Sequence, residues 1–126
     1  MSGLAIILRS DKYEDAHYAL AMASAALAVN QPAVLFFTMG GLRALMKPPQ
    51  LRDWSRDATN RERGVGDFET LLQACIELGA GMIVCEMGLR SLGIDRAGLR
   101  SDVPFTVAGI VTLLEETKPG MHLVTL

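Results

Sequence analysis

Apolar residues occur along this chain in short continuous runs, separated by longer segments of mixed character. Three of these runs, at residues 4–8, 33–37 and 81–85, are typical of strands that are buried on both faces of a sheet. Two less uniformly apolar stretches, at 106–108 and 121–125, bring the number of predicted strands to five. Because such runs leave no polar face for solvent, we expect a parallel sheet that helices cover on both sides.

The segments between the apolar runs predict helices. An alanine-rich stretch spans 13–29, and apolar residues recur at helical spacing over 68–78, directly after the N-capping residue Asp67. A further helix is expected at 110–117. Strands and helices therefore alternate, and right-handed crossovers predict a single doubly wound α/β domain over 1–126 with the strand order 2-1-3-4-5.

Residues 47–66 lack a clear apolar period and are predicted to form a flexible loop. The segment begins with Lys47 and two prolines, contains several arginines and acids, and holds the single tryptophan, Trp54. A loop of this length in a small domain is either functional or mobile. Two interpretations stay open, a lid or partner-docking arm and a solvated surface loop.

Cys85 is the candidate catalytic residue. It ends the third predicted strand and precedes the first turn of a short helix, where backbone N–H groups and the helix dipole favour a thiolate. Cys75 instead falls in the apolar stripe of its helix, as a buried free cysteine often does. Helix and strand geometry places the two Cα atoms ~12 Å apart, and a disulfide needs less than ~7 Å. An internal disulfide is therefore not expected.

The predicted topology gathers other polar groups near Cys85. In an open parallel sheet, ligands bind at the carboxyl ends of the strands, where the strand order reverses. With the order 2-1-3-4-5, that point lies between strands one and three. The turns at this edge supply the candidate substrate-binding residues Ser10, Asp11, Thr38, Gly40, Gly41 and Gly109. For the two adjacent glycines, an ordinary tight turn is the alternative to an anion-binding loop.

Composition and charge exclude several classes of function. Half of the 126 residues are hydrophobic, which is high for a small domain and favours an oligomer. A formal net charge of −2 gives no indication of nucleic-acid binding, and no apolar run approaches the ~20 residues that span a bilayer. Two histidines and two cysteines lack zinc-site spacing, and phosphate-loop and dinucleotide motifs are absent, so neither metal nor cofactor is expected. Free cysteines without a signal peptide suggest the reducing cytoplasm.

The stretch that starts at Cys85, with the sequence CEMGLRSLGI, resembles the DsrE/DsrF-like family of small sulfur-relay proteins. The alanine-rich segment 19–29, the strand and turn at 34–42 and the segment 107–116 agree with it, so the similarity covers nearly the whole chain except 47–66. The resemblance implies a three-layer α/β/α sandwich, assembly into homotrimers or homohexamers and a cytoplasmic location. It also implies that Cys85 carries sulfur as a persulfide or thiosulfonate between donor and acceptor proteins.

The residues and the resemblance together predict a sulfur carrier or sulfurtransferase that works through Cys85. Two alternatives remain at this stage. One is a non-catalytic oligomeric module that binds a small anion or nucleotide at the same edge of the sheet. The other is a one-cysteine thiol peroxide reductase, which would form a sulfenic acid on Cys85.

Overall fold

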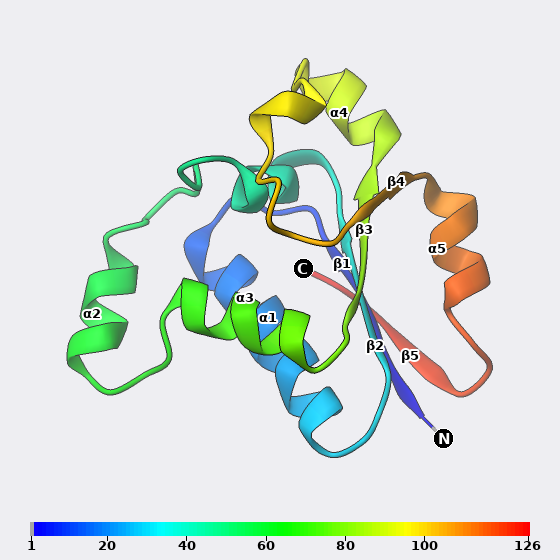
Figure 1. Ribbon diagram of the computed structural model, residues 1–126, viewed down its shortest axis with the longest axis horizontal. Helices are drawn as coiled ribbons and strands as arrows, with labels where there is room; N and C mark the ends of the chain where they lie inside the picture. Colours follow the sequence, from blue (N-terminus) through cyan, green and yellow to red (C-terminus); the bar gives the residue numbers. More distant parts are fainter. Residues whose placement is uncertain (1) are drawn as a thin grey trace.

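A computed structural model describes residues 2–126 and shows a central sheet of five parallel strands (Figure 1). The strands are β1 (Gly3–Leu8), β2 (Ala33–Phe37), β3 (Gly81–Cys85), β4 (Thr106–Ala108) and β5 (Met121–Thr125). The α-helices are α1 (Tyr13–Ala28), α2 (Arg56–Glu62), α3 (Phe68–Glu77), α4 (Glu86–Leu92) and α5 (Ile110–Glu116). Two 3-10 helices, η1 (Met39–Leu45) and η2 (Arg96–Gly98), complete the elements. All five predicted strands are present.

The order of the strands is β4-β3-β2-β1-β5, which corrects the predicted order 2-1-3-4-5. In the structure β2 lies between β1 and β3, and β5 pairs with the free side of β1. The physical reason is the direction of the crossovers. The chain moves stepwise from β1 to β4 in one direction, and the last crossover returns past β1 in the opposite direction. Right-handed crossovers then place α5 on the face of the sheet opposite to α1 and α3.

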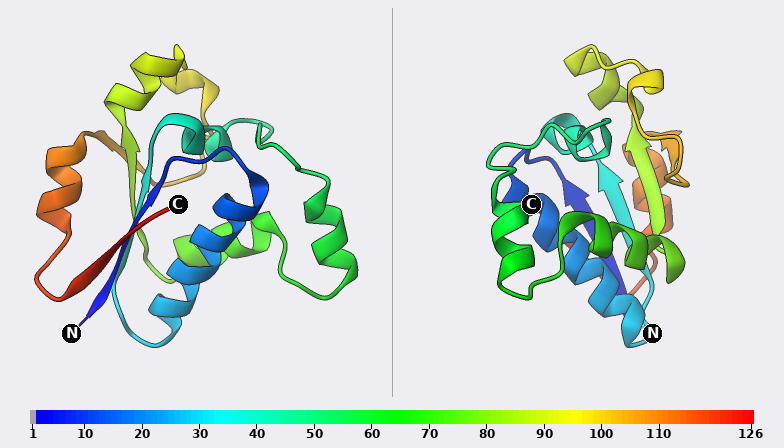
Figure 2. Two further views of the ribbon diagram at one scale, coloured as in Figure 1. Left: turned by 180° about the vertical axis from the view of Figure 1, so that it is seen from behind. Right: turned by 60° about the vertical axis from the view of Figure 1, so that its left-hand side comes forward.

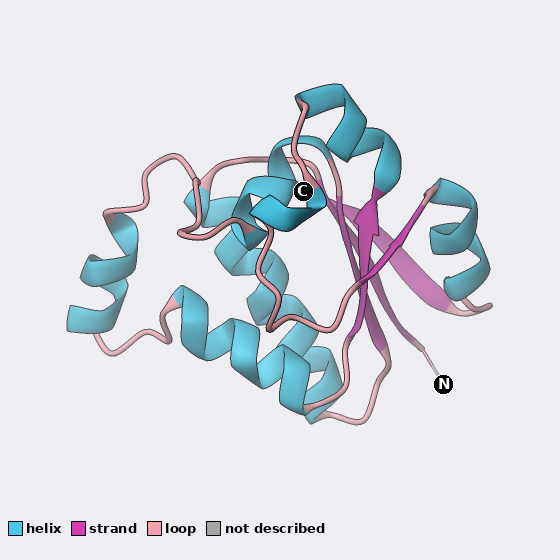
Figure 3. Cartoon of the chain, turned by 45° about the horizontal axis from the view of Figure 1, so that its top comes forward, coloured by secondary structure: helices cyan, strands magenta, loops and turns pink. Residues whose placement is uncertain are grey.

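The helices form the two outer layers of the predicted three-layer sandwich. The views in Figures 2 and 3 show α1 and α3 on one face of the sheet and α5 on the other. Side chains alternate accordingly along each strand: Ile6 and Leu8 belong to the apolar cluster on the α1 side, and Ala5 belongs to the cluster around Leu113 of α5. The larger core therefore lies between the sheet and α1, and a smaller one lies under α5.

Residues 47–66, predicted as a continuous loop, contain the helix α2. Its sequence RDATNRE has no apolar stripe, which is why the apolar pattern does not reveal it. A buried carboxylate holds it instead. Asp57 is 6% exposed and accepts hydrogen bonds from the Tyr13 hydroxyl and the Phe68 backbone N–H, and it forms an ion pair with Arg61. The segment is thus joined to the first turns of both α1 and α3.

Candidate functional site

Cys85 ends β3 at the carboxyl edge of the sheet and is also the N-capping residue of α4. Its Sγ accepts a hydrogen bond from the backbone N–H of Gly88 at 3.4 Å. The residue is 0% exposed and points to the α5 side, where it packs in one apolar cluster with Phe36 and Leu113. The strand and the helix turn therefore hold the sulfur at a fixed place, beneath the surface.

The two cysteines lie on opposite faces of the sheet. Cys75 belongs to the cluster on the α1 side, where its thiol donates a hydrogen bond to the carbonyl of Leu20 at 3.4 Å. Burial raises the pKa of the Cys75 thiol to about 11. Cys75 is thus a packed core residue and stays protonated at neutral pH. Both thiols are free, in agreement with the expected lack of an internal disulfide.

Two of the predicted neighbours of Cys85 lie beside it. The register pairs Phe37 of β2 with Val84 of β3, so the residues that follow, Thr38 and Cys85, are next to each other. On the other side Cys85 pairs with Ala108, which places Gly109 at the same edge. Thr38 is 6% exposed, and its side chain points to the α5 side like that of Cys85, since both continue the alternation of their strands.

Ser10 and Asp11 do not reach Cys85, because β2 separates β1 from β3. Neighbouring strands are ~4.8 Å apart, so two steps put these residues ~10 Å away across the sheet. Asp11 is instead bound to Arg52 by an ion pair of 2.6 Å. The prediction of these two residues as neighbours of Cys85 is therefore wrong, as a direct consequence of the wrong strand order.

Gly40 and Gly41 form a close-packed turn. A Cβ atom on Gly41 would lie 2.0 Å from the carbonyl oxygen of Leu8, and one on Gly40 would lie 2.9 Å from that of Arg9. The N–H of Gly41 already donates to the carbonyls of Arg9 and Thr38. The glycines are explained by close approach of the chain to the end of β1, which matches the tight-turn interpretation.

A cavity of about 270 Å³ opens on the α5 side of this edge. Its apolar walls include Ile7, Phe36 and Leu113, which belong to or pack against the cluster that contains Cys85. Arg9 and Thr38 supply polar groups to its lining. The sequence does not predict this cavity, because its apolar walls have the same pattern as core residues. Arg9 follows Ile7 by two residues at the end of β1, and in an extended chain such residues point to the same face. This spacing is the sequence signal that places Arg9 on the side of the cavity.

The charged residues next to Cys85 do not face its thiol. Glu86 is exposed and forms an ion pair with Arg90 at 3.0 Å on the outer side of α4. Arg43 donates a hydrogen bond to Gln50. Within residues 2–126, no three histidine, cysteine or acidic side chains come together as a metal site would require. The Gly88 N–H is therefore the polar group that contacts Sγ.

The model of one protein family matches residues 3–126. The chain belongs to the DsrE/DsrF-like family. Two solved structures have a similar fold. The YchN protein from E. coli shares 12% identity at a TM-score of 0.63, with 98% of this chain and 99% of that one covered.

The other structure is MTH1491 from Methanobacterium thermoautotrophicum, described as a protein of unknown function. It shares 13% identity at a TM-score of 0.50, with 98% of this chain and 99% of that one covered. No curated protein matches the sequence. In the part of this DsrE/DsrF-like chain that the structure describes, no helix has the length and apolar character of a membrane span.

Proposed function

We propose that the protein is a sulfur carrier that holds sulfane sulfur on Cys85 and passes it to an acceptor thiol. The observation that carries the proposal is the placement of Cys85 Sγ against the Gly88 N–H, next to the cavity at the carboxyl edge of the sheet. An N–H directed at sulfur stabilises the negative charge of a thiolate, which is the nucleophile in sulfur transfer. Membership of the family supports sulfur relay at the level of the family.

In the proposed reaction the Cys85 thiolate attacks the terminal sulfur of a donor persulfide. A new S–S bond forms on Cys85, the S–S bond of the donor breaks, and the donor thiolate leaves with the electron pair. An acceptor thiolate then attacks the terminal sulfur on Cys85 and regenerates the thiolate. With tetrathionate as donor, the thiolate attacks an inner sulfane sulfur, which leaves a thiosulfonate on Cys85 and releases thiosulfate. With thiosulfate as donor, attack on its outer sulfur leaves a persulfide on Cys85 and releases sulfite. Neither half-reaction needs an external oxidant.

A donor reaches the buried sulfur through the cavity on the α5 side. Met87, at its rim, is 51% exposed and unbranched, so it can change rotamer to open a path. Arg9 and the Thr38 hydroxyl then offer a positive charge and a hydrogen-bond donor to an anionic donor such as thiosulfate. In this proposal, Thr38 keeps the substrate-binding role that the sequence predicts for it, and Arg9 takes the role predicted for Ser10 and Asp11.

We also propose that the protein forms a homo-oligomer, a trimer or hexamer, through the α5–β5 surface. We use this name for four exposed apolar residues: Ile110, Val111, Leu114 and Leu123. These side chains are between 49% and 72% exposed, and burial of exposed apolar residues is what a protein contact provides. Sulfur donor and acceptor proteins, and a cytoplasmic location with free thiols, belong to the same proposal.

The test is intact-mass measurement of the native protein after incubation with thiosulfate, tetrathionate and glutathione persulfide. Wild type should gain the mass of the transferred group, and a reducing agent should remove it. Cys85→Ser should gain nothing. Cys75→Ser is the matched control, because it removes the other thiol and should leave uptake unchanged.

Equal sulfur uptake by Cys85→Ser and wild type would refute the role of Cys85. Lack of uptake by wild type, together with thermal stabilisation by small anions, would instead favour the non-catalytic binding module. Formation of a sulfenic acid on Cys85 at low peroxide, without sulfur uptake, would favour the peroxide reductase.

A further inference from the structure

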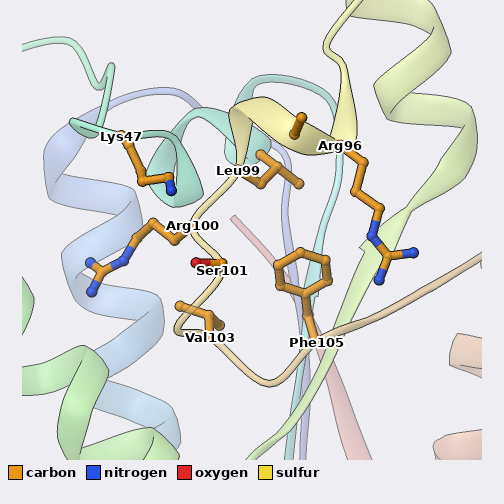
Figure 4. A pocket seen from close by; sticks show the side chains of 8 residues that line it. Lys47, Arg96, Leu99, Arg100, Ser101, Val103 and Phe105 are labelled. Carbon is orange, nitrogen blue, oxygen red and sulfur yellow. The ribbon is translucent and has the colours of Figure 1, made fainter.

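A second cavity lies on the other side of the sheet from the Cys85 thiol. It has a volume of about 490 Å³, within the roughly 300–1,000 Å³ of typical small-molecule sites. Its walls come from Lys47, which follows η1, from η2 and from the segment that leads into β4 (Figure 4). Leu99 and Val103, in its lining, belong to the apolar cluster on the α1 side, whereas Cys85 belongs to the cluster under α5. The two cavities are therefore separate sites.

The lining carries an excess of positive charge. Lys47, Arg96 and Arg100 line the cavity, and no acidic side chain does. Arg100 is neutralised by Glu69 and Asp102, which hold its guanidinium at 2.6 Å and 2.7 Å. Among residues 2–126, neither Lys47 nor Arg96 has an ion-pair partner within 4.0 Å. Neither cation is therefore held in a direct ion pair, and Lys47 interacts with Asp102 only at longer range.

An aromatic ring lies beside one of these two cations. Figure 4 shows Lys47 and Arg96 on opposite sides of the cavity, with the ring of Phe105 beside Arg96 and the segment that carries Leu99 and Ser101 toward Lys47. The Arg96 guanidinium is 5.7 Å from the centroid of the Phe105 ring, a cation–π distance. Phe105 is half-buried, and Leu99 and Val103 extend the apolar surface beside it. A ligand that fits this cavity needs both an apolar ring and a negative charge.

The wall of the cavity is held in place before any ligand binds. The Arg100 side chain is 12% exposed and joins the η2–β4 segment to Glu69 of α3. The backbone N–H of Arg100 donates to the carbonyl of Leu45, and Leu99 forms a β-bridge with Met46. A site whose wall is already ordered loses less conformational entropy on binding than a mobile loop would.

We propose that this cavity binds a small aromatic anion, whose planar ring packs beside Phe105 and whose phosphate or carboxylate group is attracted by the positive charges of Arg96 and, from the other side of the cavity, Lys47. Cations without a direct ion pair, a half-buried aromatic ring and a rigid wall coincide at this one place. The site does not depend on the sulfur chemistry proposed for Cys85, since it lies on the opposite face of the sheet. Binding here is expected to be unchanged in Cys85→Ser.

The test uses phenyl phosphate as the probe, with inorganic phosphate and phenol as its two halves, in calorimetric titrations of the whole chain. Phenyl phosphate should bind at one saturable site, at least about tenfold more tightly than either half, because it makes both contacts. Lys47→Gln and Arg96→Gln should each weaken it about three- to tenfold, the range for a partly exposed charged contact. Phe105→Leu, which keeps an apolar side chain, should weaken it by a similar factor through loss of the ring.

Arg63→Gln is the matched control, because Arg63 is an exposed arginine at the end of α2 and does not line the cavity. It should leave the affinity unchanged. Binding of phenyl phosphate that neither Lys47→Gln nor Arg96→Gln weakens would overturn the proposal. Equal affinity for inorganic phosphate would overturn the role of Phe105, and absence of saturable binding at millimolar concentrations would overturn the site itself. Circular dichroism of each variant checks that the fold is kept.

Discussion

Replacement of Asp57 by alanine should destabilise the fold strongly, although Asp57 lies in a segment without apolar periodicity. Its carboxylate accepts hydrogen bonds from the Tyr13 hydroxyl at 2.5 Å and from the Phe68 N–H at 2.8 Å. Tyr13 is 1% exposed and Phe68 is 2% exposed, so solvent does not reach these donors easily once the acceptor is gone. Asp57 thus joins three helices, α1, α2 and α3, at one buried point.

The magnitude follows from the groups that are left without a partner. Each buried donor that loses its acceptor costs roughly 1–3 kcal/mol. The Asn60 side-chain N–H donates to the Tyr13 oxygen at 3.3 Å and does not replace the lost acceptor, but entering water offsets part of the loss. We therefore expect Asp57→Ala to lower the free energy of unfolding by about 3 kcal/mol. Typical total stabilities are about 5–15 kcal/mol, so the change should be easy to measure.

Urea unfolding followed by circular dichroism measures this change. Glu62→Ala is the matched control, since Glu62 is an exposed acid on the same helix and should change the unfolding free energy by less than about 0.5 kcal/mol. Asp57→Asn keeps the shape and one acceptor oxygen, and should fall between the two. A loss of less than about 1 kcal/mol in Asp57→Ala would refute the view that this carboxylate anchors α2.

Three further predictions concern pH and packing. Burial and the hydrogen bond to Asp57 raise the pKa of Tyr13 from 10.0 to about 12, because the folded state favours the neutral hydroxyl. The stability that the neutral hydroxyl contributes should be complete below pH 10.0 and should disappear as the pH rises to about 12. Tyr13→Phe in urea titrations should remove that dependence. Hydrogen bonds from Thr70 and Arg61 lower the pKa of Asp67 from 3.8 to about 2, so the stability that it adds should be lost as the pH falls from 3.8 to about 2. Asp67→Ala should remove this acid dependence and lower the unfolding free energy at neutral pH by about 1 kcal/mol, the value of a helix N-cap; an unchanged thermal midpoint would contradict it. Gly88→Ala would place a Cβ atom 2.8 Å from the Met39 backbone nitrogen, so we expect a loss of about 1–3 kcal/mol, whereas Gly98→Ala, with nothing within 4 Å, should be tolerated.

The sequence predicts the strands of the sheet well because a strand that is buried on both faces has a continuous run of apolar residues. Residues 4–8, 33–37 and 81–85 are continuous apolar runs, and all three are central strands. The order of the strands has no comparable sequence pattern. An apolar run shows that a strand is covered, but it does not show which strand lies beside it. In β5, three of the five residues are exposed, and this is the local signal that it lies at an edge of the sheet.

The candidate site was predicted only where it depends on local sequence. Cys85 and the helix turn after it are contiguous, so their geometry follows from the chain itself. Thr38 and Gly109 were placed correctly because each ends a strand that is next to β3. The prediction that Ser10 and Asp11 lie near Cys85 required β1 to be next to β3. It is wrong because β2 lies between these two strands. The basic cavity was missed because Lys47 and Phe105 are far apart in sequence and meet only in the folded chain.

In the observed strand order, the direction of the crossovers reverses between β1 and β5. The cavity on the α5 side extends from this boundary to the edge of the apolar cluster that contains Cys85. Ile7 and Thr125 line its end at the β1–β5 boundary, and Phe36 and Thr38 line the part next to β3. In an open parallel sheet, this reversal is where space for a ligand arises, because the neighbouring crossovers cover opposite faces. For the sulfur transfer that we propose, a donor would enter through this space, while the sulfur stays in the packed region beside it. In that proposal, rotation of Met87, which lines the cavity, would open access to Cys85 without any rearrangement of the strand that holds the thiol.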